Sequence, residues 1–61
     1  MNRIKEVRVS LKISQIELAK DAGISQPFLC DLENNRRGAK PETLQRIASA
    51  LGTNVSDLME G

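Results

Sequence analysis

Few residues in this chain are of a type that could support catalysis. Cys30 is the single cysteine, and the sequence contains neither histidine nor tyrosine. A thiol without a neighbouring imidazole lacks the base that usually activates a nucleophile, and one thiol alone cannot build a transition-metal site. The carboxylates lack the spacing of a calcium-binding loop. We therefore expect a protein that is not an enzyme and that holds neither a metal ion nor a cofactor.

Basic side chains gather in one stretch of the sequence. Nine Lys and Arg residues against eight Asp and Glu give a net charge of +1, which by itself does not indicate a nucleic-acid binder. The distribution is more informative. Residues 17–33 carry four acids and one lysine, whereas between residues 34 and 46 a single acid accompanies four basic residues, Arg36, Arg37, Lys40 and Arg46. Such a local basic face suits contact with phosphate groups.

A chain of 61 residues can form one domain at most, so we expect a single domain over residues 1–61. A lone cysteine cannot form an internal disulfide, so we expect a cytoplasmic protein. No apolar run approaches the roughly 20 residues that span a bilayer, and the N-terminus lacks a secretory pattern. We therefore expect no membrane association, and a core this small leaves no room for a small-molecule effector pocket.

Apolar residues recur every three or four positions, which predicts helices throughout and no strands. One face of a first helix carries Ile4, Val7 and Leu11. Ser14, with Glu17 three residues later, is a good N-cap for a second helix over about 15–22. Gly23 can take the left-handed conformation that ends this helix.

Three further helices are expected. Ser25 can cap the third, which has Pro27 in its first turn and continues to about residue 34. Pro41 opens the fourth, and Gly52 ends it. Asn54 with Asp57 can cap a short last turn. The inward face of the fourth helix consists of Leu44, Ile47, Ala48 and Leu51. The fold class is thus all-α, a bundle of five helices.

The segment from Gln15 to Asn34 meets the steric demands of two helices that cross over a tight turn. Ala19 is small where the helices approach, and Gly23 permits the turn. The apolar seam consists of Leu18, Ala22, Ile24, Leu29 and Leu32. This segment, QIELAKDAGISQPFLCDLEN, followed by TLQRIASALG, closely resembles the Cro and phage-repressor helix-turn-helix family, the Xre-like regulators. The resemblance covers nearly the whole chain.

The resemblance implies a helix-turn-helix formed by helices 2 and 3 of a five-helix bundle. Helix 3 would enter the DNA major groove while helix 2 lies across the backbone. The implied function is sequence-specific binding of double-stranded DNA by a small transcriptional regulator, for which repression is expected and activation is the alternative. A homodimer would read a roughly palindromic operator, with recognition helices about 34 Å apart. Candidate dimer-interface residues, which could equally belong to the core, are Val55, Leu58 and Met59.

Position in the family motif also implies base-reading residues. Gln26 stands where relatives most often read a base edge, and a glutamine amide can bond adenine N6 and N7 together. Pro27 and Phe28 would contact a thymine methyl group or a sugar, although Phe28 could instead pack against its own domain. Asp31 could accept from cytosine N4, yet a carboxylate facing phosphates is repelled, and simple solvent exposure is as well supported.

A second set of residues would contact phosphates. Gln15 matches the family glutamine that donates to a DNA phosphate at the start of helix 2. The other phosphate candidates, some of which could form only a solvated turn, are Ser25, Asn34, Arg36, Arg37 and Lys40. Phosphate contacts position the protein without specifying a sequence.

Arg8 and Glu33 match two family positions that form a partly buried ion pair between helix 1 and the end of helix 3, and we expect a structural role for them. Three residues depart from the family pattern. Lys12 stands where glycine is common, Lys40 replaces a serine-like cap, and Thr53 replaces a buried valine. A lysine in the left-handed region costs about 1 kcal/mol relative to glycine.

The low net charge and the acidic helix 2 also fit an antitoxin-like or adaptor module that binds protein. Salt dependence separates the two hypotheses. The logarithm of the DNA-binding constant falls with the logarithm of the salt concentration at a slope of about −0.9n for n phosphates, whereas an apolar protein interface responds little.

Overall fold

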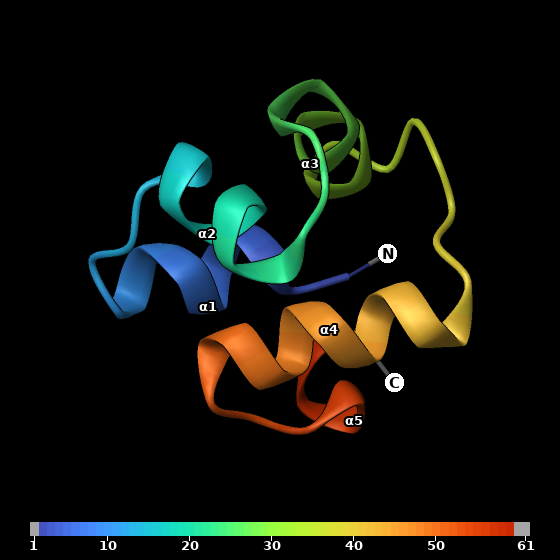
Figure 1. Cartoon of the computed structure of the whole chain (residues 1–61). Helices are drawn as coiled ribbons and strands as arrows, with labels where there is room; N and C mark the ends of the chain where they lie inside the picture. The colour runs from blue at the N-terminus through green and yellow to red at the C-terminus, as the bar shows by residue number, and fades with distance from the viewer. Residues whose placement is uncertain (1, 60–61) are drawn as a thin grey trace.

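The computed structural model describes residues 2–59 as a bundle of five helices (Figure 1). They are α1 (Ile4–Ser10), α2 (Gln15–Ala22), α3 (Gln26–Glu33), α4 (Pro41–Leu51) and α5 (Val55–Leu58). Within the described residues, β-type pairing is limited to one isolated bridge between Asn2 and Met59. The predicted all-α class is confirmed.

Local capping chemistry sets most helix boundaries. The Ser14 hydroxyl accepts a hydrogen bond from the Glu17 amide at 3.0 Å, and the Ser25 hydroxyl accepts one from the Phe28 amide at 3.2 Å. Gly23 ends α2 with φ of 71°, a left-handed conformation that costs glycine nothing. The predicted boundaries of α2, α3 and α4 are therefore confirmed to within a residue.

The end of α1 differs from the prediction. Leu11 was expected to share one helical face with Ile4 and Val7, but α1 ends at Ser10 and the Leu11 side chain is 48% exposed. The reason is Lys12, whose φ of 59° turns the chain away from the helix. Lys12 thus occupies the left-handed position where relatives often carry glycine, and the turn keeps its shape at a conformational cost.

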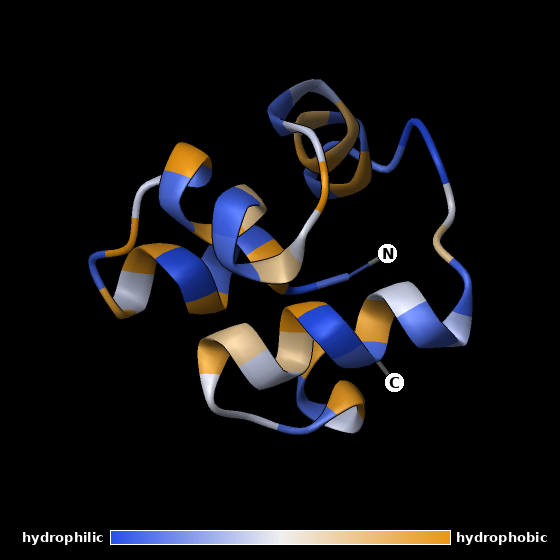
Figure 2. Cartoon of the chain, in the orientation of Figure 1, coloured by the Kyte–Doolittle hydropathy of each residue, from blue (hydrophilic) through white to orange (hydrophobic). Residues whose placement is uncertain are grey.

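The core lies where α2 packs against α3 and α4. Figure 2 shows hydrophobic and hydrophilic residues alternating along these helices. The close approach of α2 depends on Ala19 and Ala22, each 3% exposed. The fully or nearly buried larger residues are Ile4, Leu18, Leu29, Leu32, Ile47, Leu51 and Leu58. The predicted seam of the helix-turn-helix and the inward face of α4 are thereby confirmed, with Ile24 and Leu44 partly buried at the edge.

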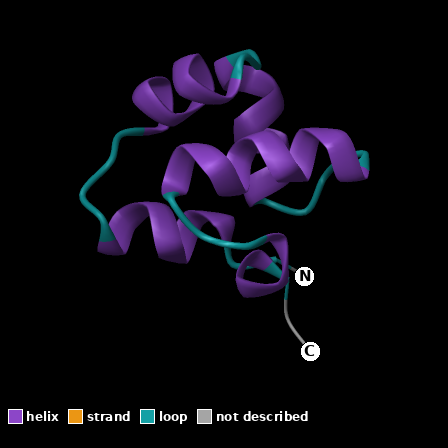
Figure 3. Ribbon diagram, turned by 60° about the horizontal axis from the view of Figure 1, so that its bottom comes forward, coloured by secondary structure: helices purple, strands orange, loops and turns teal. Residues whose placement is uncertain are grey.

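The first and last described residues, Asn2 and Met59, pair with each other beside this core. Figure 3 shows α5 beside the first described residues, and the Arg3 amide donates to the Leu58 carbonyl at 2.7 Å. Thr53, which replaces a buried valine, is half-buried and donates its hydroxyl to Asp57 at 2.8 Å. Across the described residues, no helix has the length and apolar character needed to cross a membrane.

Candidate nucleic-acid interface

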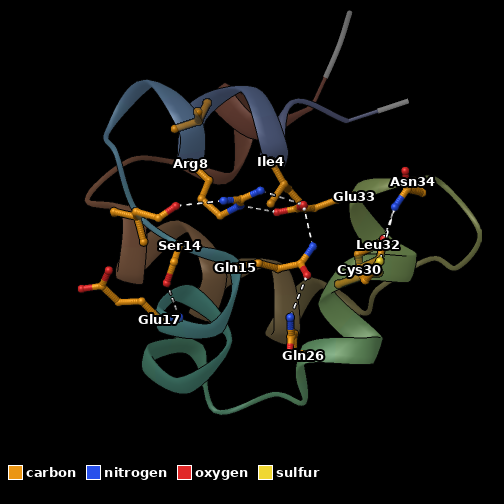
Figure 4. Close-up of polar contacts among 12 residues, drawn as sticks. Ile4, Arg8, Ser14, Gln15, Glu17, Gln26, Cys30, Leu32, Glu33 and Asn34 are labelled. Carbon is orange, nitrogen blue, oxygen red and sulfur yellow. Dashed lines mark hydrogen bonds and ion pairs between the residues drawn. The ribbon is translucent and has the colours of Figure 1, made fainter.

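A chain of polar side chains runs from α1 to the exposed start of α3, and its first link is an ion pair (Figure 4). Arg8 Nε and Nη2 donate to the two Glu33 carboxylate oxygens at 2.6 and 3.2 Å. Arg8 Nη1 donates to the Ile13 carbonyl at 2.9 Å. The Glu33 side chain is 1% exposed and the Arg8 side chain 11% exposed. The expected structural ion pair between α1 and α3 is present.

Gln15 provides the second link. Its Nε2 donates to Glu33 Oε1 at 3.0 Å, and its Oε1 accepts from Gln26 Nε2 at 3.2 Å. A carboxylate can only accept hydrogen bonds, so the amide nitrogen of Gln15 must face Glu33. The Gln15 oxygen is then left facing Gln26, which in turn must present its own nitrogen.

The helix starts bring these two glutamines together. Gln15 is the first residue of α2 and Gln26 is the first residue of α3, and each follows a serine that caps its helix. Because the tight turn at Gly23 makes the two helices cross, both amides lie at one edge of the molecule. Figure 4 shows the Gln26 side chain at the exposed end of the polar chain.

The rest of α3 divides into an exposed and a half-buried side. Pro27 is exposed, while Phe28 is half-buried and packs against the core. The Arg37 guanidinium lies 5.6 Å from the Phe28 ring centroid. Asp31 lies 3.7 Å from Arg36 Nη1 and 4.0 Å from Arg37 Nε. Phe28 and Asp31 are therefore already engaged by the loop that follows α3.

The remaining phosphate candidates differ in their availability. Ser25 and Lys40 are exposed at the starts of α3 and α4. The Asn34 amide nitrogen is turned back onto α3, where it donates to the Cys30 carbonyl at 2.8 Å and lies 3.5 Å from Cys30 Sγ. Asn34 must rotate before its nitrogen can reach a phosphate. Figure 2 shows that the loop after α3 is strongly hydrophilic.

The arrangement of α2 and α3 matches a known family. The family model for helix-turn-helix proteins matches residues 4–58 of this chain. The chain belongs to the phage-repressor type of helix-turn-helix proteins, the Xre-like family. It is 39% identical over 57 residues to the immunity repressor protein of Bacillus phage phi105, covering 93% of this chain and 40% of that protein.

Two further similarities support the membership. The chain is 42% identical over 59 residues to the HTH-type transcriptional regulator DdrOP3 of Deinococcus deserti, covering 97% of this chain and 46% of that regulator. The clp gene regulator ClgR from Corynebacterium glutamicum superposes with a TM-score of 0.86 at 30% identity, covering 88% of this chain and 57% of the ClgR chain. This helix-turn-helix chain thus spans less than half the length of the two sequence relatives.

The structure decides between the two alternatives stated for Leu58, the dimer interface and the core. Leu58 is fully buried in the core, so its side chain is not available to a second copy. Val55 is half-buried against the core, and Met59 is 42% exposed. Leu58 is buried because α5 packs against α4. Since α5 has only four residues, the spacing of its apolar residues does not show which of them face the core.

One surface groove of the described residues lies away from the polar chain. It has a volume of about 570 Å³ and lies between the end of α2 and α4. Its lining consists of Lys20, Asp21, Ala22, Gly23, Gln45, Arg46, Ser49 and Ala50. None of these residues is among the site residues predicted from the sequence.

Sequence reasoning in this helix-turn-helix chain missed two contacts. It did not foresee that Gln15 bonds Glu33, or that Arg37 covers Phe28. Gln15 and Glu33 are 18 positions apart, so only the crossing of α2 and α3 brings them together. The sequence did contain a signal for the Arg37 contact. Phe28 and Asp31 lie one turn apart on α3, and an arginine pair follows this helix.

Proposed function

We propose that this chain is a sequence-specific DNA-binding domain of a transcriptional repressor, with α3 in the major groove of double-stranded DNA. Membership in the family and similarity to an immunity repressor and an HTH-type transcriptional regulator support this function. In proteins that dock in this way, the N-terminal residues of the second motif helix contact base edges. The exposed N-terminal residues of α3 are Gln26 and Pro27.

The observation that carries the proposal is the orientation of the Gln26 amide. Its nitrogen donates one hydrogen to Gln15 Oε1, so the second hydrogen and the amide oxygen stay open for another partner. A donor beside an acceptor matches adenine N7 and N6 in the major groove. The buried Glu33 carboxylate orients the Gln15 amide, and Gln15 in turn orients the Gln26 amide. This orientation decides which Gln26 atoms can donate to a base and which can accept from it.

Phosphate contacts would come from both sides of this amide. Gln15 uses one amide hydrogen on Glu33 and retains another for a phosphate at the start of α2, where the helix dipole favours an anion. Ser25 uses its oxygen as a cap acceptor and retains its hydroxyl hydrogen. We also assign phosphate contacts to Asn34, Arg36, Arg37 and Lys40.

The domain would work as a homodimer in the cytoplasm, with residues 1–61 as one unit. A dimer places two α3 helices on half-sites about 34 Å apart and favours a roughly palindromic operator. Met59 and Val55 are the interface residues we propose, since Leu58 belongs to the core.

A salt titration tests the proposal. The duplex is first selected by the chain from random double-stranded sequences, and its dissociation constant is then measured between low and physiological salt. Binding through about six phosphates predicts that the logarithm of the binding constant falls with the logarithm of the salt concentration at a slope of about −5. A slope near zero would instead support an antitoxin-like or adaptor module that binds protein, and would overturn the DNA-binding function.

A further inference from the structure

We propose that Asp31 is a positioning residue that holds Arg36 and Arg37 beside the C-terminal half of α3, ready for DNA phosphates, rather than a residue that reads cytosine. This inference rests on the proposed DNA-binding function and assigns a different role within the same interface. It explains why a carboxylate stands on a face that would meet phosphates.

The backbone after α3 places the first arginine. The Asn35 residue has φ of 59°, its amide donates to the Leu32 carbonyl at 3.2 Å, and the Arg36 amide donates to the Asp31 carbonyl at 2.9 Å. These two bonds form the turn that commonly closes a helix C-terminus. The turn returns Arg36 to the level of Asp31, so that Nη1 lies 3.7 Å from the carboxylate.

Side-chain contacts place the second arginine. Arg37 Nε lies 4.0 Å from Asp31, and the guanidinium lies 5.6 Å from the Phe28 centroid, within the range of a cation–π contact. Phe28 and Asp31 are separated by about one helical turn and so face the same side of α3. One ring and one carboxylate together orient the Arg37 side chain.

The charges of this cluster favour phosphate binding. One carboxylate between two guanidinium groups leaves a net charge of +1, so Asp31 is shielded from the DNA backbone. The arginine side chains remain 67% and 63% exposed. A guanidinium has five donors, so each arginine can keep Asp31 as a partner and still donate to a phosphate. Holding them in place also lowers the ordering entropy that binding would cost.

A double-mutant cycle tests this role with the selected duplex. D31N preserves the size of the side chain and removes its charge. We expect D31N to weaken binding by about threefold to tenfold, equally for all duplex sequences and without change in Tm. In the R36Q/R37Q background, the same substitution should not weaken binding, because the carboxylate there only repels phosphates. D21N, at an exposed aspartate of α2, controls for the change in net charge.

Three results of the binding experiment would overturn the assignment. The first is that D31N weakens DNA binding equally in both backgrounds. The second is that D31N strengthens DNA binding in the wild-type background. The third is that D31N loses a preference for cytosine. A measurement without DNA separates this inference from the proposed function. In the free protein, NMR relaxation should show Arg36 and Arg37 Nε–H groups more mobile in D31N than in wild type, and unchanged mobility would refute the positioning role. Failure of the wild type to bind any duplex would refute only the DNA-binding function.

Discussion

The Glu33 carboxylate, 1% exposed, is held by the Arg8 guanidinium through hydrogen bonds of 2.6 and 3.2 Å. This pair joins α1 to the end of α3, and Gln15 extends it to the surface. One buried carboxylate therefore serves both the packing of the helices and the orientation of the amides at the start of α2 and α3.

Arg8→Met should destabilise the domain severely. Removing one partner leaves a buried charge uncompensated, which costs about 3–5 kcal/mol, comparable with the roughly 3–5 kcal/mol that a core of this size supplies. Unfolding followed by circular dichroism in urea measures the loss. Arg3→Met is the control, because the Arg3–Glu6 pair is exposed on both sides and should contribute less than about 1 kcal/mol. An Arg8→Met chain with wild-type stability and no DNA binding would contradict the structural role.

Lys12→Gly should stabilise the domain. Lys12 has φ of 59°, and glycine adopts this conformation without the steric cost of about 1 kcal/mol. For a domain of this size, the gain corresponds to a rise in Tm of about 4–8 °C, which a thermal unfolding curve resolves. Lys20→Gly, inside α2, should instead lower the stability by about 1 kcal/mol. A fall in Tm for Lys12→Gly would show that the turn does not carry this strain.

Lys40→Ser should change stability and DNA affinity in opposite directions. Lys40 is the N-cap of α4 and has no side-chain capping bond, so serine should add about 0.5–1 kcal/mol of stability. Loss of a phosphate contact should weaken binding and make the salt slope shallower by about 0.9. Lys5→Ser, at an exposed position of α1, should leave the slope unchanged. Tighter binding by Lys40→Ser would remove Lys40 from the phosphate-contact set.

Met59→Glu should weaken the dimer without unfolding the monomer. Met59 is 42% exposed, so a charge there meets water in the monomer but would be buried at an interface. Leu58→Ala, by contrast, empties a fully buried site and should cost about 2–5 kcal/mol. Sedimentation equilibrium measures the dimer affinity of each variant. An undiminished dimer in Met59→Glu would place the interface elsewhere.

The sequence predicts the fold well where short-range rules decide the structure. Ser14, Ser25 and Gly23 set helix boundaries through caps and a left-handed turn, and apolar spacing identifies Leu18 and Ile47 as core residues. Apolar spacing placed Leu11 on the face of the first helix, but Leu11 is the residue after α1, where the left-handed backbone of Lys12 turns the chain.

Long-range packing determines what sequence reasoning could not assign. Leu58 is buried because α5 closes under α4, and the Gln15–Glu33 bond exists because α2 and α3 cross. Asp31 was left between base reading and solvent exposure, since its arginine partners depend on the turn after α3. Residue types and spacing suggested the candidate interface residues, and the structure shows which contacts these residues make within the chain.

The most direct test of the account concerns Gln26. Duplex sequences are selected from a random pool by the wild type, by Gln26→Ala and by Gln45→Ala, which removes an exposed glutamine of α4. We expect the wild type and Gln45→Ala to prefer adenine at one position of each half-site. Gln26→Ala should lose that preference alone, a loss of about 1–3 kcal/mol of discrimination, with the other positions unchanged. Retention of the full base preference by Gln26→Ala would contradict the reading of DNA through this amide.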